Sequence, residues 1–114
     1  MKLYHNPRCR KSREGLCVLE EAGQNVEVVE YMKNPPSKDE MKDIVKKLGI
    51  TAEQLVRKTE KIFKEEFKGK SLTEAQWIDA MIKYPNLIQR PILIKGDRAA
   101  LGRPVEDIVA LMNS

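Results

Sequence analysis

The sequence predicts an α/β protein with the element order β-α-β, helical insertion, β-β-α around a small mixed sheet. Short strand candidates at 2–4, 26–31 and 92–94 are separated by segments of helical periodicity. Repeated helix-start signals fill an insertion at about 37–84. A chain of 114 residues is long enough for one hydrophobic core, so a single domain over 1–114 is expected.

The first third of the sequence has the pattern of a β-α-β unit. Lys2–Tyr4 forms a strand candidate that the Asn6-Pro7 turn ends. Apolar residues at spacings of three predict a helix over Arg10–Ala22, with Gly23 as its stop. The β-branched segment Val26–Tyr31 predicts a second strand. Two strands joined by a helix imply a parallel pair with a right-handed crossover.

Helix-start signals dominate the insertion. Ser37 and Glu40 form an S-x-x-E capping box ahead of apolar residues at helical spacing. The same signal recurs at Thr51–Gln54 and at Thr73–Gln76, and Pro85 ends the last of these helices. The insertion is therefore predicted to be helical.

The C-terminal segment predicts a hairpin followed by a helix. Ile92–Ile94 is a strand candidate, and Pro91 is tolerable at its first residue or at a sheet edge. A turn at 95–97 leads into Arg98–Leu101 as the hairpin partner, and Pro104 suits the first position of a final helix. That helix carries apolar residues on one face: Val105, Ile108, Val109 and Met112. The complete element order is that of a thioredoxin-like fold.

Composition excludes several functional classes. Hydrophobic residues make up 41% and charged residues 33% of the sequence, as in a soluble globular protein. No apolar run is long enough to cross a bilayer, and the first residues lack the apolar core of a signal peptide, so a cytoplasmic location is expected. The net charge of +4 is modest and the basic tracts are interrupted by acids, which argues against nucleic-acid binding. We expect a monomer, no membrane association and no bound metal.

Cys9 is the candidate nucleophile. It precedes the first predicted helix, where unpaired backbone N–H groups and the helix dipole favour a negative charge. Such settings, together with nearby cations, lower a cysteine pKa from about 8.5 to roughly 3.5–7.5. The sequence around it is rich in cations, namely Arg8, Arg10, Lys11 and Arg13. We therefore expect a reactive thiolate in a pocket suited to anions.

The residues around this cysteine have more than one interpretation. Cys17 is expected to be a small core residue, with a resolving thiol as the alternative. Ser12 stands where C-x-x-C proteins have their second cysteine, which favours an external reductant; its hydroxyl could cap the helix or donate to the thiolate. His5 could favour the thiolate or be a packed structural histidine. Asn6 is expected to brace the loop through Asx-type bonds.

Several separated motifs follow one another along the chain: HNPRCRKS near the N-terminus, NPPS at Asn34–Ser37, LVRKTE at Leu55–Glu60, IQRPI around Arg90 and ALGRP ending at Pro104. Together they resemble the glutaredoxin-linked arsenate reductase family, which includes Spx-type regulators. The resemblance extends over nearly the whole chain. It implies a thioredoxin fold with a helical insertion, in which one N-terminal cysteine and three arginines bind and reduce arsenate. Glutathione and glutaredoxin would supply the electrons.

The resemblance assigns roles to individual residues. It implies Cys9 as the nucleophile, Arg57, Arg90 and Arg103 as ligands of arsenate or a similar oxyanion, and Pro91 as a cis-proline facing the cysteine. Arginine suits this task because its planar guanidinium grips two oxygens and stays charged. Arg90 and Arg103 could otherwise be surface residues, and Arg57 could simply favour a helix dipole. No cofactor is expected to be bound, and glutathione would be a reducing co-substrate.

Two other functions compete with arsenate reduction. The first is a thiol oxidoreductase that acts on glutathione mixed disulfides. The second is a Spx-like regulator that binds RNA polymerase. The regulator predicts a C-x-x-C redox pair, and this chain has Ser12 at the second position.

Overall fold

The chain folds as two units, and the sequence of the second unit interrupts that of the first. The computed structural model describes residues 1–114. The first unit combines Met1–Asn34 with Arg90–Ser114, and the second comprises Pro35–Gln89. The second unit thus contains the predicted helical insertion.

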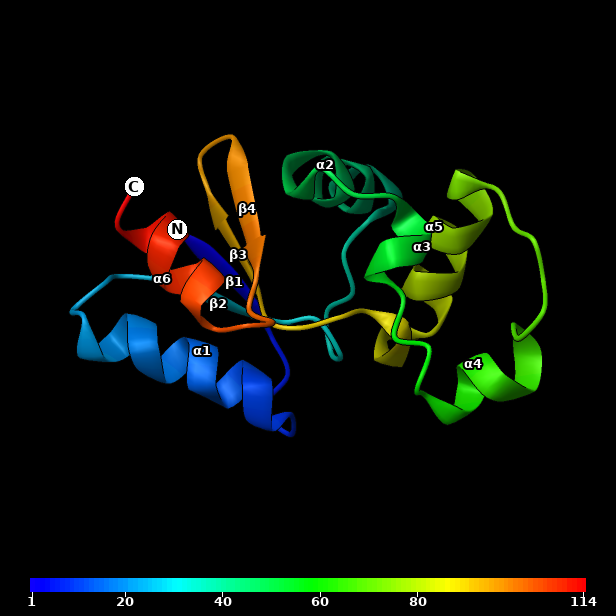
Figure 1. Ribbon diagram of the computed structural model, residues 1–114, viewed down its shortest axis with the longest axis horizontal. Helices are drawn as coiled ribbons and strands as arrows, with labels where there is room; N and C mark the ends of the chain where they lie inside the picture. Colours follow the sequence, from blue (N-terminus) through cyan, green and yellow to red (C-terminus); the bar gives the residue numbers. More distant parts are fainter. The chain divides into compact units, whose positions relative to one another are not determined.

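A four-stranded mixed sheet is the centre of the first unit (Figure 1). The strand order is β2-β1-β3-β4; β1 and β2 are parallel, and the other neighbours are antiparallel. The parallel pair, the hairpin and the thioredoxin-like element order are therefore confirmed. The strands are β1 (Lys2–His5), β2 (Glu27–Glu30), β3 (Ile92–Lys95) and β4 (Arg98–Leu101).

Two helices pack on one face of this sheet, as Figure 1 shows for α1 (Arg10–Glu21) and α6 (Glu106–Met112). Leu3 and Leu93 are paired in register between β1 and β3, and both are fully buried. The same apolar cluster includes Leu19 of α1, together with Ile108, Leu111 and Met112 of α6. Burial of these side chains fixes both helices against the strands.

The hairpin matches its prediction, whereas the start of the last helix does not. Lys95 pairs with Arg98, so Gly96-Asp97 forms a two-residue turn, and Gly96 adopts φ 59°. Pro104 was expected at the first position of α6, but the helix begins at Glu106. Pro104 lies in the preceding bend, where its carbonyl accepts from Asp107 N–H at 3.1 Å.

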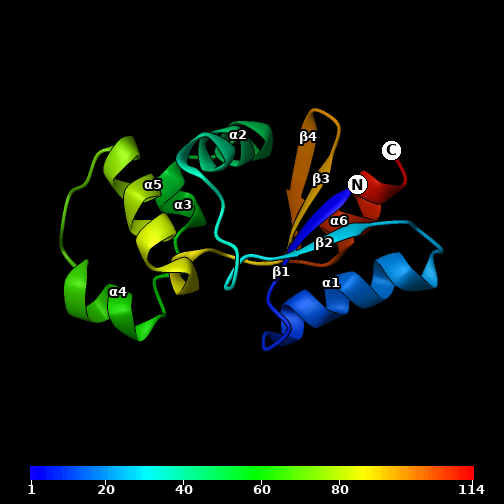
Figure 2. The same ribbon diagram turned by 180° about the vertical axis from the view of Figure 1, so that it is seen from behind.

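The second unit consists of helices. All three predicted capping boxes are present, with Ser37, Thr51 and Thr73 each accepting from the backbone N–H three residues later. In both views, α2, α3 and α5 lie together (Figures 1 and 2). The elements are α2 (Lys38–Leu48), α3 (Ala52–Leu55), α4 (Lys61–Glu66), α5 (Glu74–Lys83) and the 3₁₀ helix η1 (Pro85–Leu87).

Helix α4 has no counterpart among the start signals found in the sequence. Its N-cap, Glu60, makes no side-chain hydrogen bond to the helix, and none of its residues is buried. Ring contacts hold this region: Phe63 stacks on Trp77 of α5 with centroids 6.2 Å apart, and Phe67 lies 5.9 Å from the same ring. Tertiary aromatic packing therefore stabilises helix α4, whose local sequence contains no helix-start signal.

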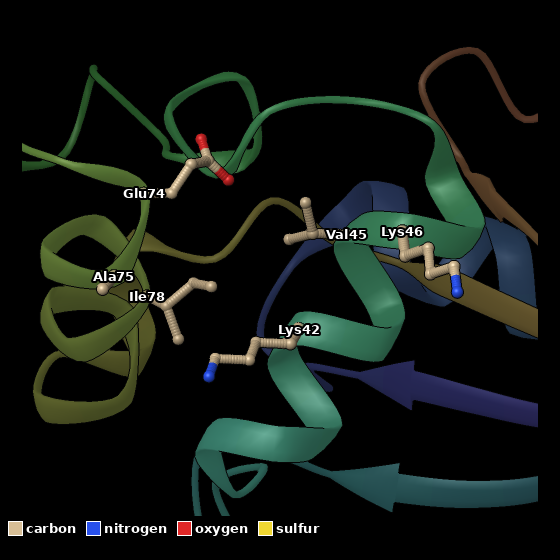
Figure 3. Close-up of a pocket in the computed structure, with 6 residues that line it drawn as sticks. All are labelled: Lys42, Val45, Lys46, Glu74, Ala75 and Ile78. Carbon is tan, nitrogen blue, oxygen red and sulfur yellow. The ribbon is translucent and has the colours of Figure 1, made fainter.

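A cavity of about 310 Å³ lies between α2 and α5. Figure 3 shows Val45 and Ile78 facing each other across it, while Lys42 extends toward α5. The carboxylate of Glu74 is already engaged, because its two oxygens accept from Ala52 N–H at 2.9 and 3.1 Å. None of the site residues predicted from the sequence lines this cavity.

No helix combines the length and the apolar character that crossing a membrane requires.

Lys95 caps the C-terminal end of α6 from the neighbouring strand. Its Nζ donates to the carbonyls of Leu111, Met112 and Ser114 at 3.4, 3.0 and 2.7 Å. These carbonyls lie at or just beyond the last turn, and a cation there also favours the helix dipole. We expect Lys95→Met to lower the free energy of unfolding by about 1–2 kcal/mol, measured by urea denaturation.

Lys33→Met provides the matched control. Lys33 is largely exposed and makes only a 3.8 Å ion pair with Glu30. Its removal should change the free energy of unfolding by less than about 0.5 kcal/mol. Equal losses for the two variants would contradict a specific role for Lys95.

Candidate active site

The register of the sheet brings three separate segments to one end of the first unit. Tyr4 pairs with Ile92, and Ile92 pairs with Leu101. The end of β1, the start of β3 and the end of β4 therefore lie side by side. The loop that carries Cys9 follows β1, Arg90 precedes β3 and Arg103 follows β4. These three predicted site residues consequently meet.

Cys9 is the N-cap residue of α1, as the sequence predicted. Its backbone is extended and its N–H donates to the carbonyl of Asn6 at 3.0 Å. Burial by itself raises the pKa of the Cys9 thiol. The backbone N–H of Ser12, the Arg90 guanidinium and the backbone N–H of Lys11 outweigh that effect, so the pKa lies below its ordinary value.

Two arginines from distant parts of the sequence face the sulfur. Arg103 donates from Nη2 to Cys9 Sγ at 3.5 Å and from Nε to the carbonyl of Arg90 at 2.9 Å. Arg90 is only 5% exposed, and its guanidinium hydrogen bond to Cys9 lowers the pKa of the thiol. The Arg103 side chain is therefore oriented by the backbone at Arg90, and both guanidinium groups adjoin the same sulfur.

Pro91 occupies a slot that two glycines leave open. A Cβ on Gly102 would lie 2.6 Å from Pro91 Cγ and 2.8 Å from Ile108 Cδ1, and a Cβ on Gly15 would lie 2.8 Å from Pro91 Cγ. Gly102 N–H also donates to the Pro91 carbonyl at 2.8 Å. The Arg90–Pro91 bond is cis, as the resemblance implied, and the bond between Arg103 and Pro104 is also cis.

His5, Asn6 and Ser12 form a buried hydrogen-bonded group beneath the cysteine loop. Ser12 Oγ accepts from Asn6 N–H at 2.9 Å and lies 2.7 Å from His5 Nδ1. Burial is the main reason why the pKa of His5 lies below its ordinary value, which favours the neutral imidazole.

The roles left open for these residues are narrowed by this geometry. No side chain caps α1. The Ser12 hydroxyl bonds instead to His5 at the end of β1, and the backbone N–H of Ser12 lowers the pKa of the Cys9 thiol. Asn6 braces the loop as predicted, because its Oδ1 accepts from Arg8 N–H at 3.0 Å.

The cations adjacent to Cys9 are directed elsewhere. Arg10 and Lys11 both pair with Glu14, at 3.5 and 3.9 Å. Arg13 donates to the carbonyl of Pro7 at 2.9 Å. The side-chain cation that holds the pKa of Cys9 down is instead Arg90, far along the sequence.

The expectation that Cys17 belongs to the core is wrong. Cys17 is exposed, because the buried face of α1 is formed by Ser12, Gly15 and Leu19. Its thiol donates to Glu21 Oε1 at 3.3 Å. This bond and the negative charge of Glu21 raise the pKa of Cys17, which makes it the less reactive thiol near neutral pH.

Arg57 lies in the second unit, directly after Val56, the C-cap of α3. Its N–H donates to the carbonyl of Leu87 at 2.6 Å, next to the Val56–Ile88 bridge. Its Nη1 lies 3.1 Å from Glu60 Oε1. Glu60 was not among the predicted site residues, although a carboxylate three residues after an arginine is a recognisable pairing signal.

Replacing Arg90 should make the Cys9 thiol less acidic. In a Cys17→Ser background, the pH dependence of the iodoacetamide alkylation rate reports the pKa of Cys9 alone. Because the guanidinium favours the thiolate, Arg90→Ala should raise the midpoint and slow alkylation at neutral pH. Arg10→Ala should leave the midpoint in place, since Arg10 pairs with Glu14; an unchanged midpoint in Arg90→Ala would overturn this assignment.

Comparisons with known proteins place this site in a family. Residues 4–111 match the model of the ArsC family. The chain is 40% identical to the arsenate reductase of Neisseria meningitidis serogroup A over 98% of this chain and 97% of that protein. The solved structure of the arsenate reductase from Vibrio cholerae superposes with a TM-score of 0.91 at 37% identity, covering 96% of this chain and 97% of that one. The chain therefore belongs to the ArsC family.

Proposed function

We propose that this protein is an arsenate reductase in which Cys9 is the nucleophile. The observation that carries the proposal is the arrangement of Cys9 Sγ at the N-terminus of α1, 3.5 Å from Arg103 Nη2 and hydrogen-bonded to Arg90. A thiolate at this position is reactive and lies where an anion can be held. The names of the relatives, arsenate reductase in Neisseria meningitidis and in Vibrio cholerae, support the same substrate.

The chemistry explains why arginines surround the sulfur. Arsenate is an oxyanion, so its approach to a thiolate brings two negative groups into contact. Fixed cations offset this repulsion, and guanidinium groups can hold two oxygens at once without losing their charge. We assign oxyanion binding to Arg90 and Arg103; the family resemblance implies Arg57 as a further ligand.

The proposed reaction balances with two external thiol equivalents. The Cys9 thiolate attacks arsenic, an S–As bond forms, and one arsenate oxygen leaves as water after protonation. A glutathione thiolate then attacks the Cys9 sulfur, and the S–As electron pair stays on arsenic, reducing As(V) to As(III). Arsenite leaves, and glutaredoxin reduces the Cys9–glutathione disulfide by thiol exchange.

The environment of Cys9 favours an external reductant. The position three residues later is Ser12, whose hydroxyl is buried between His5 and Asn6. Cys17 is exposed on α1 and hydrogen-bonded to Glu21. We therefore propose glutathione and glutaredoxin as electron donors, which places the reaction in the cytoplasm.

The first test is arsenate reduction with glutathione and glutaredoxin supplied. The wild-type protein should turn over arsenate, Cys9→Ser should be inactive, and Cys17→Ser should retain wild-type kcat. Activity toward a glutathionylated substrate together with indifference to arsenate would favour the general thiol oxidoreductase instead.

Removal of Arg103 should weaken catalysis without unfolding the protein. Arg103→Ala removes a charged donor aimed at the reacting sulfur, so kcat/KM for arsenate should fall about 10- to 100-fold. Arg13→Ala is the control, because Arg13 is bonded to the Pro7 carbonyl and should retain kcat/KM. A loss of similar size in both variants would contradict a specific role for Arg103.

A further inference from the structure

The segment that contains Cys9 carries most of the excess positive charge of the chain. Residues 7–14 contain four basic residues and one acid, a formal charge of +3, whereas the whole chain has a net charge of +4. All other residues together therefore contribute only +1. The four basic side chains form what we call the basic rim of Cys9: Arg8, Arg10, Lys11 and Arg13.

The basic rim is exposed and only partly neutralised. All four of its residues are exposed, and the Arg10 and Lys11 side chains are 85% and 52% accessible to solvent. These two cations share one carboxylate, that of Glu14, at distances of 3.5 and 3.9 Å. Glu14 is the only acid before Glu20 in the sequence. Arg13 donates to a neutral backbone carbonyl, so its charge is not offset there.

The basic rim is separate from the groups that act directly on the sulfur. The guanidinium group of Arg90 lowers the pKa of Cys9, and Arg103 donates to its sulfur at 3.5 Å. Arg90 is only 5% exposed, and both donors converge on the reacting atom. Three of the rim side chains instead bond to Glu14 or to a backbone carbonyl. The geometry of the oxyanion site therefore does not account for the basic rim.

Exposed charges of one sign around a reactive atom act mainly on the approach of a partner. Solvent weakens each charge alone, but several together raise the potential over the surface and speed the association of an oppositely charged partner by about 10- to 1,000-fold. Such charges change the association rate and its salt dependence more than the final affinity. The basic rim therefore favours acidic partners that come close to Cys9.

The proposed reaction requires one partner of this kind. It leaves Cys9 in a disulfide with glutathione, and a further thiol must reach that disulfide. A small anion is held by converging donors such as Arg90 and Arg103, whereas the rim side chains are spread over the Cys9 loop and the first turn of α1. Such a broad exposed surface fits another protein. A nucleic acid is also acidic, but it carries no thiol.

We propose that the basic rim is the docking surface for a protein thiol reductant whose reactive cysteine is surrounded by acidic side chains. This inference rests on the proposed function, because it takes Cys9 as the sulfur that enters the disulfide. In the docked complex the reductant thiolate attacks the glutathione sulfur, and the S–S bond to Cys9 breaks. The electron pair of that bond leaves on Cys9 as a thiolate, while the reductant is oxidised to a disulfide with glutathione.

The rate of this exchange tests the docking surface. Cys17→Ser protein is converted to its Cys9–glutathione disulfide, and reduction by a glutaredoxin of net negative charge is followed by mass spectrometry. The second-order rate constant should fall as ionic strength rises, because salt screens the attraction. In the same background, Arg10→Gln/Lys11→Gln should lower it about three- to tenfold at low ionic strength and weaken its salt dependence. An unchanged rate constant overturns the proposal.

The opposite end of the sheet supplies a matched control. Lys2 and Arg98 are the first residues of β1 and β4, which run in the same direction, whereas the Cys9 loop follows the end of β1. Lys2→Gln/Arg98→Gln removes the same amount of charge away from Cys9, so the rate constant should stay at its starting value. An equal fall in this variant would show that only the overall charge matters, which would contradict a docking surface.

A small thiol separates docking from the reactivity of the disulfide. Dithiothreitol attacks the same disulfide, and Arg10→Gln/Lys11→Gln should slow this reaction by less than about twofold. A fall as large as that with glutaredoxin would show that the rim acts on the attacking thiolate alone, and equal glutaredoxin rates together with weaker binding of a DNA duplex by the variant would assign the rim to nucleic acid; both results overturn the proposal.

These rates are measured without arsenate, so they do not depend on the proposed substrate. A selective loss with glutaredoxin supports the docking surface even if the protein fails to reduce arsenate. Arsenate reduction by the wild-type protein, combined with equal glutaredoxin rates in the variant, overturns the docking surface and leaves the proposed function standing.

Discussion

The stabilisation of a negative sulfur at Cys9 is the constraint on which the rest of this structure depends. Partial burial by itself raises the pKa of the Cys9 thiol, so the pKa lies below its ordinary value only because hydrogen-bond donors and a cation outweigh that effect. The backbone N–H groups of Ser12 and Lys11 come with the first turn of α1, and the guanidinium groups of Arg90 and Arg103 come from segments far along the sequence. Donors that are fixed before the reaction need no reorganisation when charge develops.

The sheet supplies that fixed geometry. Because β1, β3 and β4 are adjacent and in register, the segments at their ends cannot separate without breaking the ladder. The Pro91 ring is then seated against Gly15 and Gly102, where no side chain could fit without a shift, and the Arg90 carbonyl orients Arg103. Packing of small residues around one proline thus contributes to the electrostatics of the sulfur.

The burial of each arginine determines how strongly its positive charge acts on neighbouring groups. Arg10 is largely exposed and paired with Glu14, so solvent and its partner attenuate its field. Arg90 is buried, and its charge acts on the thiol at short range. Arg57 is intermediate: it is three-quarters buried and paired with Glu60. A net charge of +4 therefore says less about anion binding than the position of a few guanidinium groups.

Features that depend on local interactions could be predicted from the sequence alone. Four features depend on residues a few positions apart: the capping boxes, the β-α-β unit, the hairpin turn and the cysteine at a helix start. Their sequence patterns therefore predict them without knowledge of the tertiary structure. The exposure of Cys17, the bend at Pro104 and the existence of α4 had no decisive local signal. The tertiary structure decided these features. The buried face of a helix and the cations that lie beside a thiol both depend on segments that only folding brings together.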